Sequence, residues 1–114
     1  MSKNYVPERN HIVFIEKYRP ALILSSTEYN KSTGLVICCP ISTSIRGAIT
    51  EVPINNLEKP SVVAANLIQT LSWKERKIKF LIEAETSVMD EVLFRIIPLI
   101  GADQLFARMM APHG

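Results

Sequence analysis

The sequence predicts a small, mainly β domain, either a barrel or a strongly bent sheet, followed by a C-terminal helix. Residues 1–85 hold seven short apolar segments separated by turn residues. From residue 86 onward the spacing of apolar residues changes from a strand-like to a helical pattern. A chain of 114 residues can bury one core but not two, so residues 1–114 are expected to form a single domain.

Each expected strand is a run of apolar and β-branched residues bounded by residues that favour turns. Segment 35–39 is continuously apolar, which is typical of a strand buried on both faces. The seven expected strands span residues 12–15, 21–24, 35–39, 50–54, 62–65, 68–71 and 78–82. The polar tracts 26–34 and 54–60 are expected to be loops.

The C-terminal helix is expected at residues 87–100, with Thr86 or Ser87 as its cap. Gly101 provides its end, and Pro98 removes one backbone hydrogen bond late in the helix, which predicts a kink or an early finish there. A short tail follows residue 101, in which residues 103–110 form a second amphipathic piece. The excess of apolar residues on the helix predicts that it packs across the barrel and covers a dimer seam.

Composition and charge exclude several classes of protein. Hydrophobic residues make up 47% and charged residues 21%, as in a soluble globular protein. No apolar run reaches the roughly 18 to 20 residues of a membrane span, and the N-terminal residues lack the apolar core of a signal peptide, so a cytoplasmic protein is expected. The adjacent Cys38 and Cys39 are expected to pack on opposite faces of a strand in a reducing compartment. No spacing typical of a metal site or a Gly-rich phosphate loop is present, so no metal or cofactor is expected.

The segment 19–47 contains side chains that can bind a phosphodiester. Arg19 opens the second strand, and its guanidinium stays charged and can bind two phosphate oxygens at once. Ser42 and Thr43 end the third strand and supply hydroxyl groups. This combination indicates RNA as a ligand. From the residues alone, a surface arginine and a plain polar turn remain open as alternatives.

The link between the first two strands is unusual on physical grounds. Residues 16–20 contain no Gly, Asn or Asp to supply the positive φ that tight hairpins favour. Either the two strands do not form a simple hairpin, or the link is strained, or residues usually present there are absent.

Several motifs occur in an order and spacing that resemble MazF/PemK-type toxins over residues 5–101. They are Arg19-Pro20-Ala21, Tyr29-Asn30-Lys31-Ser32-Thr33-Gly34, Cys39-Pro40-Ile41-Ser42-Thr43 with Arg46-Gly47, Glu51-Val52 and Ser72-Trp73-Lys74-Glu75-Arg76. The resemblance implies an SH3-like barrel with a C-terminal helix, of the type that MazF, PemK and CcdB toxins share. It also implies a homodimeric endoribonuclease of a type II toxin–antitoxin system, which cuts single-stranded RNA at short sequences without a metal. The implied partner is an antitoxin whose acidic, initially disordered tail occupies the RNA groove, in a complex that binds DNA.

The resemblance also implies roles for particular residues. Arg19 is expected to stabilise the phosphorane that forms when the 2′-hydroxyl attacks the phosphate. Ser42, where the family usually has Thr, can donate to the phosphate or relay a proton, and Thr43 is the second choice. Glu16, at a family acidic position, is the expected base. The expected RNA-binding residues are Lys17, Tyr18, Arg46, Asn66, Gln69, Lys74 and Arg76, with Trp73 or Tyr18 as a stacking face.

Two departures from the family pattern leave alternatives open. The family loop after the first strand is longer, and Asn66 and Leu67 stand where the family has Asp and Gln. One alternative is therefore a weakened or inactive member that still binds RNA or antitoxin. Another is a gyrase-poisoning toxin of the CcdB type, although such a toxin has no need of an RNA-cleaving pair such as Arg19 and Ser42.

Overall fold

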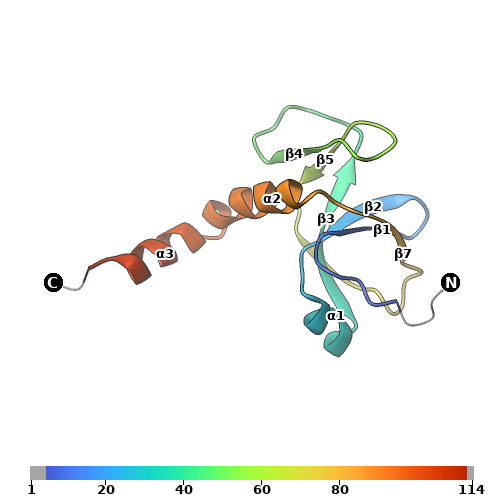
Figure 1. Cartoon of the computed structure of the whole chain (residues 1–114), viewed down its shortest axis with the longest axis horizontal. Coiled ribbons are helices and arrows are strands. Elements are labelled where there is room, and N and C mark those ends of the chain that lie inside the picture. The colour runs from blue at the N-terminus through green and yellow to red at the C-terminus, as the bar shows by residue number, and fades with distance from the viewer. Residues whose placement is uncertain (1–4, 113–114) are drawn as a thin grey trace.

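The computed structural model describes residues 5–112, which form seven strands and three helices (Figure 1). In chain order the elements are β1 (His11–Ile15), β2 (Arg19–Ile23), α1 (Thr27–Thr33), β3 (Leu35–Ser42), β4 (Glu51–Ile54), β5 (Ser61–Ala64), β6 (Gln69–Ser72), β7 (Lys79–Glu83), α2 (Thr86–Leu99) and α3 (Ala102–Met110). The seven expected strands and the C-terminal helix are confirmed. The largest difference among the strands is in β3, which continues to Ser42 instead of ending at Cys39.

Strand β3 organises the sheet because it is hydrogen-bonded along both edges. One edge pairs antiparallel with β2, with Ala21 opposite Pro40. The other edge pairs first with β6 and then, near its end, with β5, where Ile41 lies opposite Val63. The strand order is β4-β5-β3-β2-β1-β7, with β6 beside β3 off this path. Two successive partners on one edge of a single strand produce the bent sheet that the sequence predicts.

Apolar side chains pack on both faces of this sheet. Successive side chains of a strand point to opposite faces, so Ile12 and Leu22 enter one apolar cluster and Val13 and Ile23 enter the other. Helix α2 covers the first cluster with the buried side chains of Val88, Met89, Val92 and Ile96. Trp73 packs against the second cluster and donates from its indole nitrogen to the backbone oxygen of Asn30 at 2.8 Å. Trp73 therefore serves the core, and Tyr18 is the aromatic ring left free for stacking.

The tract 26–34 forms helix α1, so the prediction of a loop there was wrong. The Ser26 side chain caps this helix by accepting a hydrogen bond from the backbone nitrogen of Tyr29 at 3.2 Å. Gly34 ends it in the left-handed conformation, at φ 72°. Asn30 is fully buried and donates from its side chain to the backbone oxygen of Pro7 at 2.7 Å. The polar composition that indicated a loop instead supplies caps and a buried hydrogen bond.

The link between β1 and β2 is a closed turn of three residues, because Ile15 pairs with Arg19. Glu16 and Tyr18 both adopt the left-handed conformation, at φ 55° and φ 58°. For residues other than glycine this conformation costs about 1–2 kcal/mol each. Of the alternatives that the sequence leaves open, the structure therefore shows a hairpin with a strained link.

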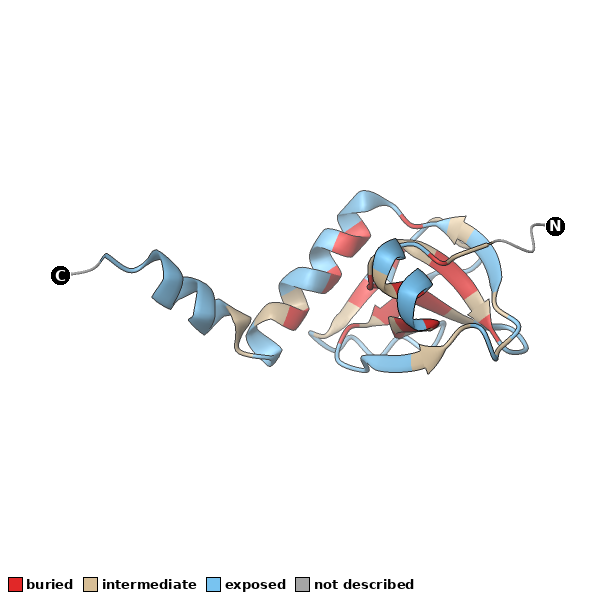
Figure 2. Ribbon diagram, turned by 90° about the horizontal axis from the view of Figure 1, so that it is seen from below, coloured by how far each residue is buried: buried red, intermediate tan, exposed pale blue. Residues whose placement is uncertain are grey.

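The two C-terminal helices differ in how far they are buried. Helix α2 begins at Thr86, and its N-cap position is Glu85, without a side-chain cap, so the prediction of a Thr86 or Ser87 cap was wrong. It finishes one residue after Pro98, as expected. Gly101, at φ 77°, separates α2 from α3. Helix α3 confirms the second amphipathic piece that the sequence predicts. It projects from the barrel and has no buried residue (Figure 2). Within residues 5–112, no helix is both long enough and apolar enough to cross a membrane.

Candidate functional site

A small hollow beside the β1–β2 turn brings together several of the predicted site residues. Its volume is about 290 Å³. Four polar or charged side chains line it, from the turn, from the start of β2, from the start of β6 and from the segment between β6 and β7: Glu16, Arg19, Gln69 and Arg76. Two arginines and one glutamate leave an excess of positive charge there, as an anionic ligand requires. We call this the Arg19 hollow.

Ser42 is not among the residues that line this hollow. Strands β2 and β3 pair from Ile23–Cys38 to Ala21–Pro40. The β2–β3 pairing ends there, and Ser42 pairs with Val62 of β5. Only a continuation of the β2–β3 register by two residues sets Ser42 opposite Arg19. Ser42 is exposed, and its hydroxyl accepts a hydrogen bond from the backbone nitrogen of Ser44 at 3.0 Å. The hydroxyl proton is thus free for an incoming ligand.

Glu16 is held by an ion pair across the mouth of the hollow. Its carboxylate accepts from the guanidinium of Arg76, and both side chains are partly exposed to solvent. An ionised carboxylate offers about four acceptor positions, so this contact leaves room for a further hydrogen bond. The pair ties the β1–β2 turn to the segment that precedes β7 and fixes the position of Glu16.

Thr43, the second hydroxyl candidate, lies elsewhere. It lines a separate hollow with Phe14, Leu57 and Lys59. The two hollows share Pro20. Thr43 lies in the bend after β3, so the alternation of strand side chains does not relate its direction to that of Ser42.

The loop after β3 is organised by a residue that sequence reasoning did not assign to the site. The carboxylate of Glu51 accepts hydrogen bonds from the backbone nitrogens of Arg46, Gly47 and Ala48, at 3.1, 2.9 and 3.3 Å. Gly47 has φ 77°, the left-handed conformation that lets consecutive N–H groups converge on one anion. Glu51 thereby holds the loop that carries Arg46. The signal in the sequence is an Arg-Gly pair with an acid four residues after the glycine.

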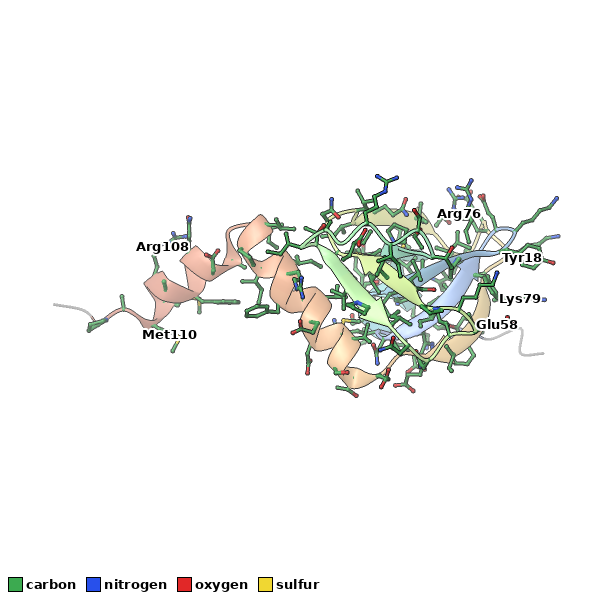
Figure 3. All side chains as sticks on the ribbon, turned by 90° about the horizontal axis from the view of Figure 1, so that it is seen from above. Tyr18, Glu58, Arg76, Lys79, Arg108 and Met110 are labelled. Carbon is green, nitrogen blue, oxygen red and sulfur yellow. The ribbon has the colours of Figure 1, made fainter. Side chains whose placement is uncertain are left out.

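The opposite side of the β1–β2 turn carries a second basic surface. Here Tyr18, 84% exposed, makes an edge-to-face contact with Phe14 at 6.2 Å between ring centroids. Three lysines line the same hollow of about 590 Å³: Lys17, Lys77 and Lys79. In Figure 3, Tyr18, Lys79 and Arg76 lie at the end of the barrel away from α3. Lys77, Lys79 and Phe14, which are not among the expected RNA-binding residues, therefore line the same hollow as Lys17 and Tyr18.

Three of the predicted RNA-binding residues do not line the hollows described above: Arg46, which lies on the loop that Glu51 holds, Asn66 and Lys74. The ammonium group of Lys74 lies 5.9 Å from the centroid of the Trp73 ring, and its aliphatic chain packs beside Gly34. Asn66 is exposed in the turn between β5 and β6. Their roles stay predictions.

The two cysteine thiols are buried and unreactive. Cys38 and Cys39 are fully buried in β3, and burial raises the pKa of the Cys38 thiol to about 11 and of the Cys39 thiol to about 12. Both thiols are thus protonated at neutral pH, which fits a packing role. Among residues 5–112, no three His, Cys, Asp or Glu side chains gather as a metal site requires.

Comparisons with known proteins point to one family. Residues 5–100 match the family described as PemK-like, MazF-like toxins of type II toxin–antitoxin systems. Endoribonuclease MazF3 of Mycobacterium tuberculosis is 34% identical over 88 residues, which cover 73% of this chain and 85% of that protein. A crystal structure of MazE–MazF from Deinococcus radiodurans superposes with a TM-score of 0.82 and 36% identity, covering 86% of this chain and 99% of that chain.

A second relative is longer than this chain over the matched region. Endoribonuclease toxin MazF of Escherichia coli K12 is 28% identical over 86 aligned residues, which cover 78% of that protein. The same match covers 67% of this 114-residue chain, or about 76 residues, so about ten aligned positions have no counterpart here. A shortened segment within the matched region produces such a difference.

Proposed function

The chain belongs to the PemK-like, MazF-like family of type II toxin–antitoxin toxins, and on this premise we propose that it is an endoribonuclease that cleaves single-stranded RNA at short sequences. The observation that carries the proposal is the Arg19 hollow, in which two guanidinium groups, a carboxylate and an amide line one small cavity. The relatives named as endoribonucleases also favour RNA cleavage over gyrase poisoning.

The proposed reaction uses the 2′-hydroxyl of the RNA as the nucleophile. Glu16 accepts the proton of this hydroxyl, the 2′-oxygen attacks the adjacent phosphorus, and the bond to the departing 5′-oxygen breaks. Arg19 stabilises the dianionic phosphorane by two parallel hydrogen bonds. Ser42 donates a hydrogen bond to a phosphate oxygen, and the departing 5′-oxygen takes up a proton from water, either directly or by relay through the Ser42 hydroxyl. The products are a 2′,3′-cyclic phosphate and a free 5′-hydroxyl, and no metal takes part.

The proposed RNA track extends from the hollow in two directions. Gln69 and Arg76 line the hollow itself, and Arg46 lies on the loop that Glu51 holds. On the other side of the turn, Tyr18 supplies a stacking face among lysines. A chain of phosphates bound to such a row of cations makes affinity fall steeply as salt rises.

We propose the partners of the toxin on the same grounds. The acidic, initially disordered tail of a cognate antitoxin occupies the RNA groove, since a row of carboxylates satisfies the same cations as a row of phosphates. Helix α2 buries one side against the barrel and exposes apolar residues on another: Leu93, Phe94, Leu99 and Ile100. A helix that is apolar on two sides belongs inside an assembly, so α2 covers the seam of a homodimer.

A binding module without cleavage is the second candidate. The ion pair between Glu16 and Arg76 supports it, because the guanidinium occupies a carboxylate oxygen that would otherwise be open to the 2′-hydroxyl. Asn66, which cannot accept a proton at neutral pH, supports it as well.

The deciding experiment incubates the protein with a long single-stranded RNA in EDTA and maps the fragment ends. Cleavage at discrete sites that disappears in Arg19→Ala and Ser42→Ala, with cyclic phosphate ends, supports the proposal. Arg108→Ala, which removes a guanidinium from α3 at the far end of the molecule (Figure 3), is the matched control and keeps its activity. Tight binding of intact RNA by every variant would assign the protein to the second candidate.

A further inference from the structure

Helix α3 presents an apolar face that the described chain leaves uncovered. Its four large apolar side chains are exposed: Leu105 at 46%, Phe106 at 47%, Met109 at 69% and Met110 at 84%. The first three recur at the spacing of one helical face, whereas Asp103, Gln104 and Arg108 lie on the rest of the surface. We call these four residues the α3 face.

The barrel gains little from α3. The helix lies outside the region shared with the family, which ends at residue 100, and it contacts α2. It extends the molecule: the radius of gyration is 15.4 Å, against about 13 Å for a compact domain of this length. Because α3 contributes so little to the stability of its own domain, we expect its apolar side chains to be buried against a partner.

A complementary apolar hollow lies on the same molecule, between α2 and the segment that leads into β4. Its apolar lining is Ile49, Phe94, Pro98 and Leu99, and its volume is about 450 Å³. The guanidinium of Arg95 at its rim already has hydrogen-bond partners. It donates to the backbone oxygen of Ile49 and, at 3.3 Å, to the carboxylate of Glu91. We call this the α2 hollow. It is part of the same exposed side of α2 that the proposed homodimer covers.

We propose that the α3 face of one copy packs against the α2 hollow of a second copy, and that the exchange is reciprocal. A two-fold axis makes both contacts at once, because each copy carries one arm and one hollow. The exchange would bring the exposed apolar side chains of α3 and of the α2 hollow into one interface, and a stable interface buries ~800 Å² per partner.

The charge of α3 argues against other occupants. A membrane-surface helix carries many lysines or arginines on its polar face, whereas α3 has one arginine and one aspartate. An acidic antitoxin tail seeks cations, which the α3 face lacks. An electrically neutral apolar face is best matched by the equally apolar α2 hollow. The stoichiometry rests on the proposed homodimer, but the arm lies outside the family region and the ribonuclease site.

The test is the molar mass of the full chain, measured by light scattering after gel filtration over a wide range of concentrations. The double variant Leu105→Glu/Met109→Glu is expected to dissociate at a concentration at least about tenfold higher than the original protein, because it buries charges in an apolar contact. Phe94→Glu, which alters the hollow, is expected to act in the same direction. Gln104→Glu adds a charge outside the α3 face and leaves the mass curve unchanged. Circular dichroism checks folding, and α3 has no buried residue whose loss unfolds the barrel.

A crosslinking experiment identifies the occupant directly. Met109→Cys and Ile49→Cys are placed on separate copies with different tags, mixed and oxidised. A disulfide between the two tags supports the exchange, and Gln104→Cys in place of Met109→Cys gives the background. Identical mass curves for the original protein and the double variant, with no crosslink, would overturn the proposal. Loss of antitoxin binding or of vesicle binding in a double variant of unchanged mass would equally overturn it. RNA cleavage, assayed on the same samples, reports separately on the ribonuclease proposal.

Discussion

Replacing Asn30 with alanine tests how much the buried polar network behind α1 stabilises the fold. The side-chain amide donates to the backbone oxygens of Pro7 at 2.7 Å and Ser25 at 3.3 Å, and its oxygen accepts from the Ser25 hydroxyl. Asn30 is fully buried, so water cannot simply replace these bonds. A lost hydrogen bond costs about 1 kcal/mol and an orphaned buried group about 1–3 kcal/mol. The Ser25 hydroxyl keeps its bond from the backbone nitrogen of Ile37 at 2.9 Å, so Pro7 is the main orphan. We expect a loss of about 3–4 kcal/mol.

Urea unfolding followed by fluorescence of Trp73 measures this loss. Trp73 is the sole tryptophan, and its indole donates to the backbone oxygen of Asn30, which the substitution retains. Asn66→Ala removes the same side chain from an exposed turn and should change the free energy of unfolding by less than about 0.5 kcal/mol. A loss below about 1 kcal/mol for Asn30→Ala would refute the reasoning, because it would mean that the network is readily replaced.

Three further predictions concern the site and its strands. Glu51→Gln keeps the size of the side chain but weakens its hydrogen bonds to three backbone nitrogens, so the loop that carries Arg46 should lose its fixed position. In filter binding over a salt series, the affinity for RNA should then be several-fold lower than that of the original protein, and it should decrease less steeply as salt rises. Tyr18→Asn removes the aromatic ring and places a residue that tolerates the left-handed backbone conformation. The free energy of unfolding should therefore change by less than about 1 kcal/mol. If a base stacks on Tyr18, the free energy of binding to single-stranded RNA should become weaker by about 1–3 kcal/mol. Burial raises the pKa of Cys38 to about 11 and of Cys39 to about 12, above the value of about 8.5 in an unfolded chain. The contribution of the two thiols to stability is therefore full below pH 8.5 and is lost as pH rises toward 11–12. Urea unfolding between about pH 7 and 10.5 should show a decline in the free energy of unfolding, and this decline should be smaller in a variant with valine at both positions.

The strands could be predicted because each is an apolar run of ordinary strand length between turn residues. Helix α1 could not, since Ser, Asn and Gly are equally typical of loops and of helix caps. What decides between them is the burial of Asn30 against Pro7, a contact between segments that are distant in the sequence.

The candidate site could be predicted in part. Arg19 follows from its chemistry and its place at a strand start, but its proximity to Gln69 and Arg76 depends on strand pairing that no local pattern encodes. Ser42 ends β3 and Thr43 lies in the following bend, so the separate hollow that Thr43 lines could be found only from the fold. The contact between Glu16 and Arg76 joins residues far apart in the chain and required the fold.

The closed turn between β1 and β2 also has a kinetic consequence. A long flexible loop at the mouth of a binding groove must become ordered whenever a ligand enters, and that ordering opposes binding and slows it. Here the rim is three residues long, braced by the hydrogen-bond ladder of the hairpin and by the ion pair of Glu16 with Arg76. Entry into the Arg19 hollow therefore requires no gate to open and no loop to settle. Under the proposed function, antitoxin and RNA compete for a site whose rim needs no ordering, so their relative association rates decide which one binds first.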